Sequence, residues 1–312
     1  MRFFLSFLFL ITILLGAGID VQSQDPVVNI SFKQNSDNSV DFNFQKNIPG
    51  TIFVSIKFDR LENAMQQTYK GCIRGTTGKV FTLKPRDPNK GIGFSWSYQY
   101  QRGRPISRLK KDFVYLLPFK DQATVKAHKL FYLGKQFGKG APDTWAAYQF
   151  LTKQNEPVLA ARKGLVVQVV DRFIADTSKT STYTASVNEV IIEQRDGTLA
   201  RYSGFKGGSV KVKEGQLVYP QQVLGLSGRY DSNLRSEIRF CVYYLNTRDI
   251  DNLDNKIKRM NIHSYVNPRF HWKGGESIIL PRNDYVAEST EELIMQEFSR
   301  REKKKYLKGE LN

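Results

Sequence analysis

The segment that most constrains the fold is residues 223–244, where a glycine-containing turn leads into a strongly alternating strand. Successive side chains of a strand point to opposite faces of its sheet, so alternate residues share a face. One face of this strand is apolar, with Ile238, Phe240 and Val242. The other face holds Glu237, Arg239 and Cys241. The pattern predicts a strand that is buried on one side and carries chemistry on the other.

The length of 312 residues allows two domains, each with its own core, and 40% hydrophobic with 25% charged residues is typical of a folded protein. The chain opens with one arginine and an apolar run shorter than the roughly 20 residues of a membrane span. We expect residues 1–23 to be a cleaved signal peptide, with no cysteine nearby to take a lipid. The protein is then exported, and periplasmic or outer-membrane associated.

Residues 24–115 contain several short period-2 runs separated by Asn, Asp, Gly and Pro. Such runs with turn residues between them predict a β-sandwich, which we expect to be immunoglobulin-like. Four aromatic residues alternate in its last run: Phe94, Trp96, Tyr98 and Tyr100. We expect them to pack, because large aromatic side chains are mostly buried, and glycan binding by this ledge is the weaker alternative.

Beyond residue 116, glycines and apolar residues follow one another in a regular order. Asp196 and Gly197 predict a hairpin turn, and Gly164 is expected at a turn with positive φ. Further tight turns are expected at Gly215, Gly225 and Gly228.

This order, from EPVLAARKGLVVQVV to the alternating strand, resembles the LytM/lysostaphin-type zinc endopeptidases of metallopeptidase family 23. The family strand Gly-Pro-His-Leu-His-Phe-Glu-Val matches residues 235–242 without a gap. The resemblance implies a LytM-type barrel-sandwich hybrid β-domain over residues 116–285, with an extension similar to that of exported Bacteroidota relatives. The whole chain is therefore predicted to be all-β, with a short charged helix or tail over residues 286–312.

The resemblance also implies where a zinc site would lie, and the matching positions hold other residues. Gln149 matches the family aspartate, Gly204 the histidine of Tyr-x-His, and Glu237 and Arg239 the His-x-His pair. The preceding family histidine falls near Trp145. An arginine guanidinium offers only donors and cannot ligate a cation, so no metal or other cofactor is expected. We interpret the chain's three histidines as structural or surface residues: His128, His263 and His271.

Two hypotheses describe this face of the strand. In the first, Arg239 pairs with Glu237 in place of a metal, because buried charges normally pair. In the second, Arg239 with Lys211 or Lys213 binds a carboxylate of cell-wall material or of an acidic partner. The net charge of +17 favours anionic envelope surfaces as partners, since export removes nucleic acid, although it is equally explained by solubility. Cys72 and Cys241 are expected to be separate thiols.

The carboxyl end has the pattern of a helix, with a capping box predicted at Ser289 and Glu292 and basic residues over 300–308. Its apolar stripe is short, which favours a solvated tail over docking or membrane contact. The sequence thus predicts a non-catalytic binding or scaffold protein of the cell envelope. The alternative is a zinc endopeptidase that acts on peptidoglycan stem peptides with an atypical site.

Overall fold

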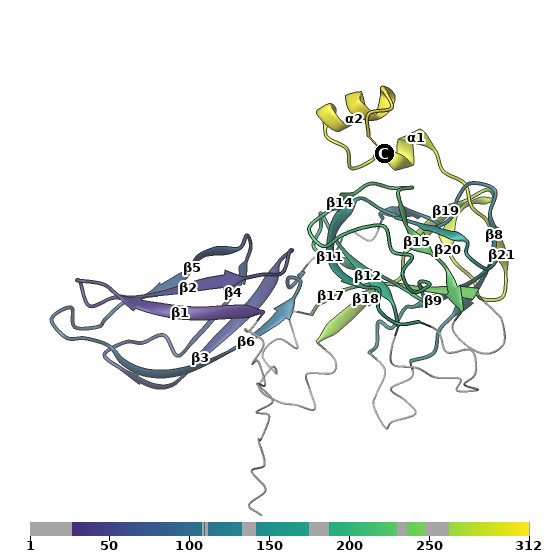
Figure 1. The fold of residues 1–312 in the computed structure, drawn as a ribbon. Helices are drawn as coiled ribbons and strands as arrows, with labels where there is room; N and C mark the ends of the chain where they lie inside the picture. Colours follow the sequence, from purple (N-terminus) through teal and green to yellow (C-terminus); the bar gives the residue numbers. More distant parts are fainter. Residues whose placement is uncertain are drawn as a thin grey trace, which may run out of the picture.

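The computed structural model describes residues 27–107, 109, 112–132, 142–174, 187–229, 236–246 and 262–311. The predicted signal peptide, residues 1–23, lies outside the described residues. Strands dominate the described part and two short helices follow near its carboxyl end, which confirms the all-β prediction (Figure 1). None of the helices in these residues is long and apolar enough to cross a membrane.

The amino-terminal part is a sandwich of two three-stranded sheets, ordered β1-β2-β5 and β4-β3-β6. Its strands are β1 (Val28–Gln34), β2 (Val40–Lys46), β3 (Ile52–Glu62), β4 (Thr68–Ile73), β5 (Thr77–Leu83) and β6 (Gly93–Arg102). Alternate residues of both sheets meet in one core, among them Phe42 and Ile56. The aromatic residues of β6 pack against this core as predicted. The immunoglobulin-like topology and the domain boundary at residue 115 stay predictions.

The larger part, here called the barrel after the predicted domain, is built around one ten-stranded sheet. Its order is β14-β11-β12-β13-β17-β9-β8-β21, and β16 and β18 also pair with β17. A two-stranded sheet, β10-β15, and a three-stranded sheet, β20-β19-β7, complete it. The first strands are β7 (Val114–Leu116), β8 (Thr124–Lys129), β9 (Tyr148–Thr152), β10 (Pro157–Leu159), β11 (Gly164–Val170), β12 (Glu189–Gln194) and β13 (Leu199–Ser203). The others are β14 (Leu217–Val218), β15 (Val223–Leu226), β16 (Gly228–Arg229), β17 (Ser236–Leu245), β18 (His263–Val266), β19 (Arg269–Trp272), β20 (Gly275–Ile278) and β21 (Asp284–Val286).

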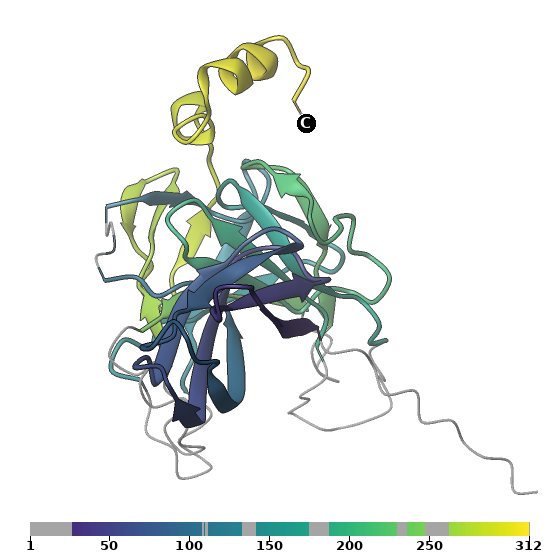
Figure 2. The ribbon, with the colours of Figure 1, turned by 90° about the vertical axis from the view of Figure 1, so that its left-hand side faces the viewer.

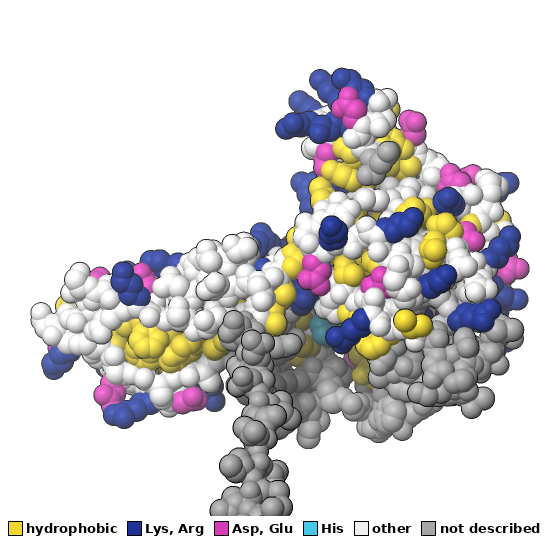
Figure 3. Space-filling model, in the orientation of Figure 1, with side chains coloured by type: hydrophobic (Ala, Val, Ile, Leu, Met, Phe, Trp, Pro, Cys, Tyr) yellow, Lys and Arg dark blue, Asp and Glu magenta, His cyan; other side chains and the backbone are white. Residues whose placement is uncertain are grey.

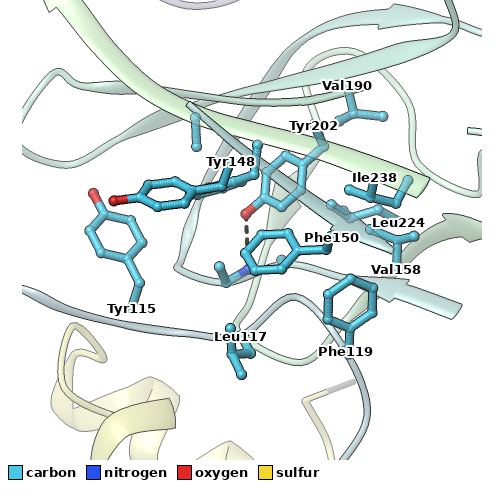
Figure 4. Packing of buried hydrophobic residues seen from close by; sticks show 14 of the residues in the cluster. Tyr115, Leu117, Phe119, Tyr148, Phe150, Val158, Val190, Tyr202, Leu224 and Ile238 are labelled. Atoms are coloured by element: carbon cyan, nitrogen blue, oxygen red, sulfur yellow. Dashed lines mark hydrogen bonds between the residues drawn. The ribbon is translucent and has the colours of Figure 1, made fainter. Parts of the chain in front are cut away.

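The apolar face of β17 lies in the core of this part, as the alternation predicts. Ile238, Phe240 and Val242 are at most 1% exposed. Aromatic rings from neighbouring strands surround them, and the Tyr202 hydroxyl accepts a hydrogen bond of 2.9 Å from the amide of Ala161 (Figure 4). The opposite face of β17 is therefore the one available for a site.

Three of the glycines have another role than the sequence predicted. Gly197 and Gly215 have positive φ in turns, as expected. Gly164, Gly225 and Gly228 instead lie within strands and are not among the residues with positive φ. A Cβ at Gly164 would lie 2.6 Å from the carbonyl oxygen of Glu193. These positions need glycine because a neighbouring chain segment packs too closely for a side chain.

The carboxyl end forms two helices, α1 (Glu291–Ile294) and α2 (Arg300–Leu307), rather than one. The predicted capping box at Ser289 and Glu292 is wrong: Thr290 caps α1, and the capping box lies at Ser299 and Glu302 of α2. Nor is this segment a solvated tail. Its apolar residues pack on the barrel with Leu116 and Tyr219, so the short stripe is wide enough to dock.

The sandwich contacts the barrel through polar and apolar groups. The Glu193 carboxylate accepts hydrogen bonds from the amide and hydroxyl of Thr51, at 2.7 and 2.6 Å. Arg102 donates to the carbonyl of Val167 at 2.7 Å. Three buried side chains form a small cluster between the parts: Phe53, Leu245 and Ile262. The sandwich thus lies beside the sheet that contains β17 (Figures 1 and 2).

Candidate functional site

The candidate site is the polar face of β17, which lies between β9 and β13 in the sheet. Arg239 is opposite Gln149 on β9 and opposite Ser203 on β13. His128 of β8 is in turn opposite Gln149. Because directly paired residues point to the same face of a sheet, these four side chains form one row across four strands.

The centre of the face is a hydrogen-bonded cluster of Gln149, Glu237 and Arg239. The Gln149 amide donates to one carboxylate oxygen of Glu237, and Arg239 Nε donates to the other oxygen at 2.8 Å. The Glu237 side chain is only 8% exposed, whereas that of Arg239 is 23% exposed. Both oxygens of the carboxylate therefore have a partner, which a charge so far from water requires.

Gly204 lies directly beside this cluster, immediately after β13. Its φ is +103°, and a Cβ built on it would lie 2.6 Å from the carbonyl oxygen of Glu237. Any side chain at this position would collide with the backbone of β17 unless a strand moved. The local backbone therefore leaves no room for a histidine at the position that matches the family's Tyr-x-His motif.

Cys241 continues the same face, opposite Arg201 on β13. Arg201 Nε donates to Glu189 at 2.6 Å, so its charge is already paired. Burial raises the pKa of Cys241 to about 11 and outweighs the lowering effect of Arg201. A thiol with such a pKa is a poor nucleophile at neutral pH. Cys72 lies far away on β4 of the sandwich, and both thiols are free, as predicted.

The fold sets the surroundings of the other two histidines and of Trp145, the residue near the predicted first motif. Burial lowers the pKa of His263 to about 4, so this residue of β18 is neutral at physiological pH. Nε2 of His271, on β19, lies 3.3 Å from a carboxylate oxygen of Glu288. The indole N–H of Trp145 donates a hydrogen bond of 2.8 Å to the carbonyl of Leu130. Over the described ranges, no three His, Cys, Asp or Glu side chains are placed to hold a metal ion.

Lys211 and Lys213, the predicted helpers of Arg239, lie outside the strands of the polar face. Both are exposed on the segment between β13 and β14. The Lys211 amide donates to the carbonyl of Leu224 in β15, a strand that pairs with β10 and not with β17. Their role beside Arg239 stays a prediction.

Sequence reasoning missed His128, which it placed upstream of the first motif. The pairing of β8 with β9 brings it next to Gln149. The signal was present in the sequence: Val125 and Ala127 alternate with polar residues, as in a strand, and both are buried. The register with β9 is set by tertiary packing, however, and no local pattern reveals it.

Of the comparisons with known proteins, the one with solved structures finds similar chains. No protein-family model matches the sequence, and neither does any curated protein. The catalytic domain of lysostaphin from Staphylococcus simulans is 19% identical, with 40% of this chain and 79% of that chain covered and a TM-score of 0.26. The M23 metalloprotease pseudoalterin, from the deep sea, is 13% identical, with 42% and 70% covered and a TM-score of 0.30.

Csd3 of Helicobacter pylori is similar over a longer stretch, with 90% of this chain and 77% of that chain covered, 12% identity and a TM-score of 0.30. The other neighbours include proteins named as lysostaphin, M23 and LytM peptidases. At such identities and TM-scores the likeness assigns neither family nor activity to this chain. The function has to be argued from the residues on the polar face of β17.

Proposed function

We propose that this chain is a non-catalytic binding or scaffold protein of the bacterial cell envelope. In this proposal a peptidase-like barrel engages a protein partner or peptidoglycan through the polar face of β17. The signal-peptide pattern and the resemblance to LytM-type enzymes in the sequence support an exported location. The degenerate character and the partner are both part of the proposal.

The observation that carries the proposal is the closed cluster of Gln149, Glu237 and Arg239. A hydrolytic zinc site needs three protein ligands and an open position for water. Here the Glu237 carboxylate has both oxygens occupied by donors, and Arg239, two residues further along the same strand, is a permanent cation. Arg239 keeps a positive charge 2.8 Å from Glu237, which repels a metal cation. The face is thus organised by internal pairing, which suits it to hold its shape while it binds.

One observation favours the alternative, a zinc endopeptidase with an atypical site. His128 is a ligand-type residue, and it lies in the same row as Gln149 and Arg239. A histidine two strands from Arg239 is separated from it by about 10 Å of sheet, since neighbouring strands are about 4.8 Å apart. Metal binding there would require Glu237 to exchange both of its present partners.

One set of measurements on the purified mature chain distinguishes the two functions. We expect retention on peptidoglycan sacculi or crosslinking to an envelope protein, no stoichiometric zinc, and no release of stem peptides with or without added zinc. Cleavage that depends on zinc and is lost in His128→Ala would contradict the proposal and establish the alternative.

The binding face is tested with Arg239→Ala, which we expect to weaken retention or crosslinking at least tenfold. Arg60→Ala is the matched control, because Arg60 and Glu62 are also an Arg–Glu pair two residues apart on a strand, but 73% and 60% exposed on the sandwich. Unchanged binding by Arg239→Ala, or an equal loss in Arg60→Ala, would show that partners do not bind at the polar face of β17.

A further inference from the structure

Helix α2 carries a concentration of positive charge that the proposed function does not use. Its outward surface, here called the α2 basic face, has six exposed basic residues: Arg300, Arg301, Lys303, Lys304, Lys305 and Lys308. Among the residues that the structure describes, no acidic side chain pairs with any of the six. Figure 3 shows the basic side chains gathered over α2 at the outer end of the molecule.

The single acidic residue within α2 does not neutralise this face, because it is turned toward the barrel. Both carboxylate oxygens of Glu302 lie 2.7 Å from Lys163 Nζ, and the Tyr219 hydroxyl donates to one of them at 3.1 Å. Glu302 thus compensates a lysine of the barrel, and the exposed Glu310 just beyond the helix is one carboxylate against six cations. A face with so many unpaired like charges attracts a polyanion at moderate ionic strength.

The orientation of α2 is fixed by its inner side. Phe298 and Tyr306 pack with Leu116 and Tyr219 of the barrel. Glu297, just before α2, accepts two hydrogen bonds of 2.8 Å from the buried guanidinium of Arg162. Both views of the ribbon show the two helices standing out from the barrel, with no other described element beyond them (Figures 1 and 2). The basic face can therefore meet a flat surface without rearrangement of the barrel.

We propose that the α2 basic face binds the anionic phospholipid headgroups of a membrane surface. Leu307 distinguishes this partner from a soluble polyanion: it is 66% exposed on the same helix as the cations. A basic helix with an exposed apolar side chain lies in the headgroup region, where the cations meet phosphates and the apolar group enters the acyl boundary. The contact would hold the barrel at a membrane while the polar face of β17 serves its partner.

The test is cosedimentation of the mature chain with vesicles of phosphatidylglycerol and phosphatidylcholine, against vesicles of phosphatidylcholine alone. We expect binding only to the anionic vesicles, weakened by salt. Each Lys or Arg near such a surface changes the binding constant about fivefold, so three fewer cations should lower it about one-hundredfold. The variant combines Lys303→Gln, Lys304→Gln and Lys305→Gln.

A matched control removes three exposed lysines from the sandwich and its loops: Lys33→Gln, Lys57→Gln and Lys84→Gln. It has the same net charge as the α2 variant and should bind nearly as the parent does. Leu307→Ala should bind vesicles severalfold more weakly but soluble polyglutamate as well as the parent. Equal losses in both triple variants, or binding to polyglutamate without binding to anionic vesicles, would overturn the proposal.

Discussion

Replacement of Arg162 by methionine tests how the carboxyl-terminal helices are held on the barrel. The Arg162 side chain is 3% exposed and lies between two carboxylates. It donates two hydrogen bonds of 2.8 Å to Glu297 and one of 2.8 Å to Asp196. Its guanidinium carbon also lies 3.6 Å from the centroid of the Phe113 ring. Methionine keeps the length and apolar stem of the side chain and removes only the charge and the donors.

The expected loss of unfolding free energy follows from the two carboxylates that remain after the guanidinium is removed. Removal of one partner from a buried ion pair costs about 3–5 kcal/mol, because the other charge stays desolvated. Here two carboxylates stay behind, but their side chains are 20% exposed in Asp196 and 13% exposed in Glu297. Asp196 also keeps its bonds from the amide and hydroxyl of Thr198. We therefore expect Arg162→Met to lower the free energy of unfolding of the barrel by about 3 kcal/mol, at the lower end of that range.

The measurement is urea unfolding at neutral pH followed by tryptophan fluorescence. A Trp96→Phe background leaves only Trp145 and Trp272, which both lie in the barrel. The control is Arg269→Met, in a pair with Glu276 that is 44% and 39% exposed and lies in the same part of the molecule as both tryptophans, where we expect a loss below about 1 kcal/mol. If Arg162→Met costs less than about 1 kcal/mol, the buried pairing does not stabilise the barrel and the reasoning is refuted.

Two further predictions concern single residues. The pKa of Glu302 is lowered to about 2, because hydrogen bonds from Lys163 and Ser299 outweigh the raising effect of burial. The stability that ionised Glu302 contributes is therefore complete above about pH 4.5 and is lost as the pH falls toward 2. The difference in unfolding free energy between parent and Glu302→Gln should shrink over that interval. A difference that does not change with pH would contradict this prediction. Gly204→Ala should lower the free energy of unfolding by about 2–3 kcal/mol, because φ is positive there and the new Cβ would clash with the backbone of β17. Gly208 also has positive φ but has open space around it, so Gly208→Ala should cost about 1 kcal/mol. Equal losses in the two glycine variants would show that the clash is relieved at little cost.

The parts of the structure that the sequence predicted are those that depend on local periodicity. The alternation along β17 predicts both its buried face and the shared face of Glu237 and Arg239, because a strand has a period of two. The pairing of these two charges follows from their spacing and burial. The hairpin turn that contains Asp196 and Gly197 is equally local, since it lies within the four residues between β12 and β13.

Other features depend on distant segments and could not be predicted. The chain has two Ser-x-x-Glu sequences near its carboxyl end, beginning at Ser289 and Ser299. Both fit a capping box equally well in sequence. Only the second forms one, because Thr290 caps α1 and the Ser289 hydroxyl donates instead to Asp121. In the same way, the row that joins His128 to Gln149 depends on the register of β8 against β9, which is set by the packing of the barrel.

The turn between β12 and β13 connects the appended parts of the molecule to the candidate site. The Asp196 carboxylate accepts a hydrogen bond from Arg162, and Arg162 also donates to Glu297, which lies between the two carboxyl-terminal helices. The Asp196 backbone carbonyl accepts a hydrogen bond from Arg104, in the segment that follows the sandwich. The same turn leads into β13, whose Ser203 is opposite Arg239. One turn therefore holds both the sandwich connection and the helices. If α2 binds a membrane as proposed, a force on α2 would be transmitted through these hydrogen bonds to β13, the strand beside the polar face of β17. This arrangement favours a protein whose attachments and binding face act as one rigid unit.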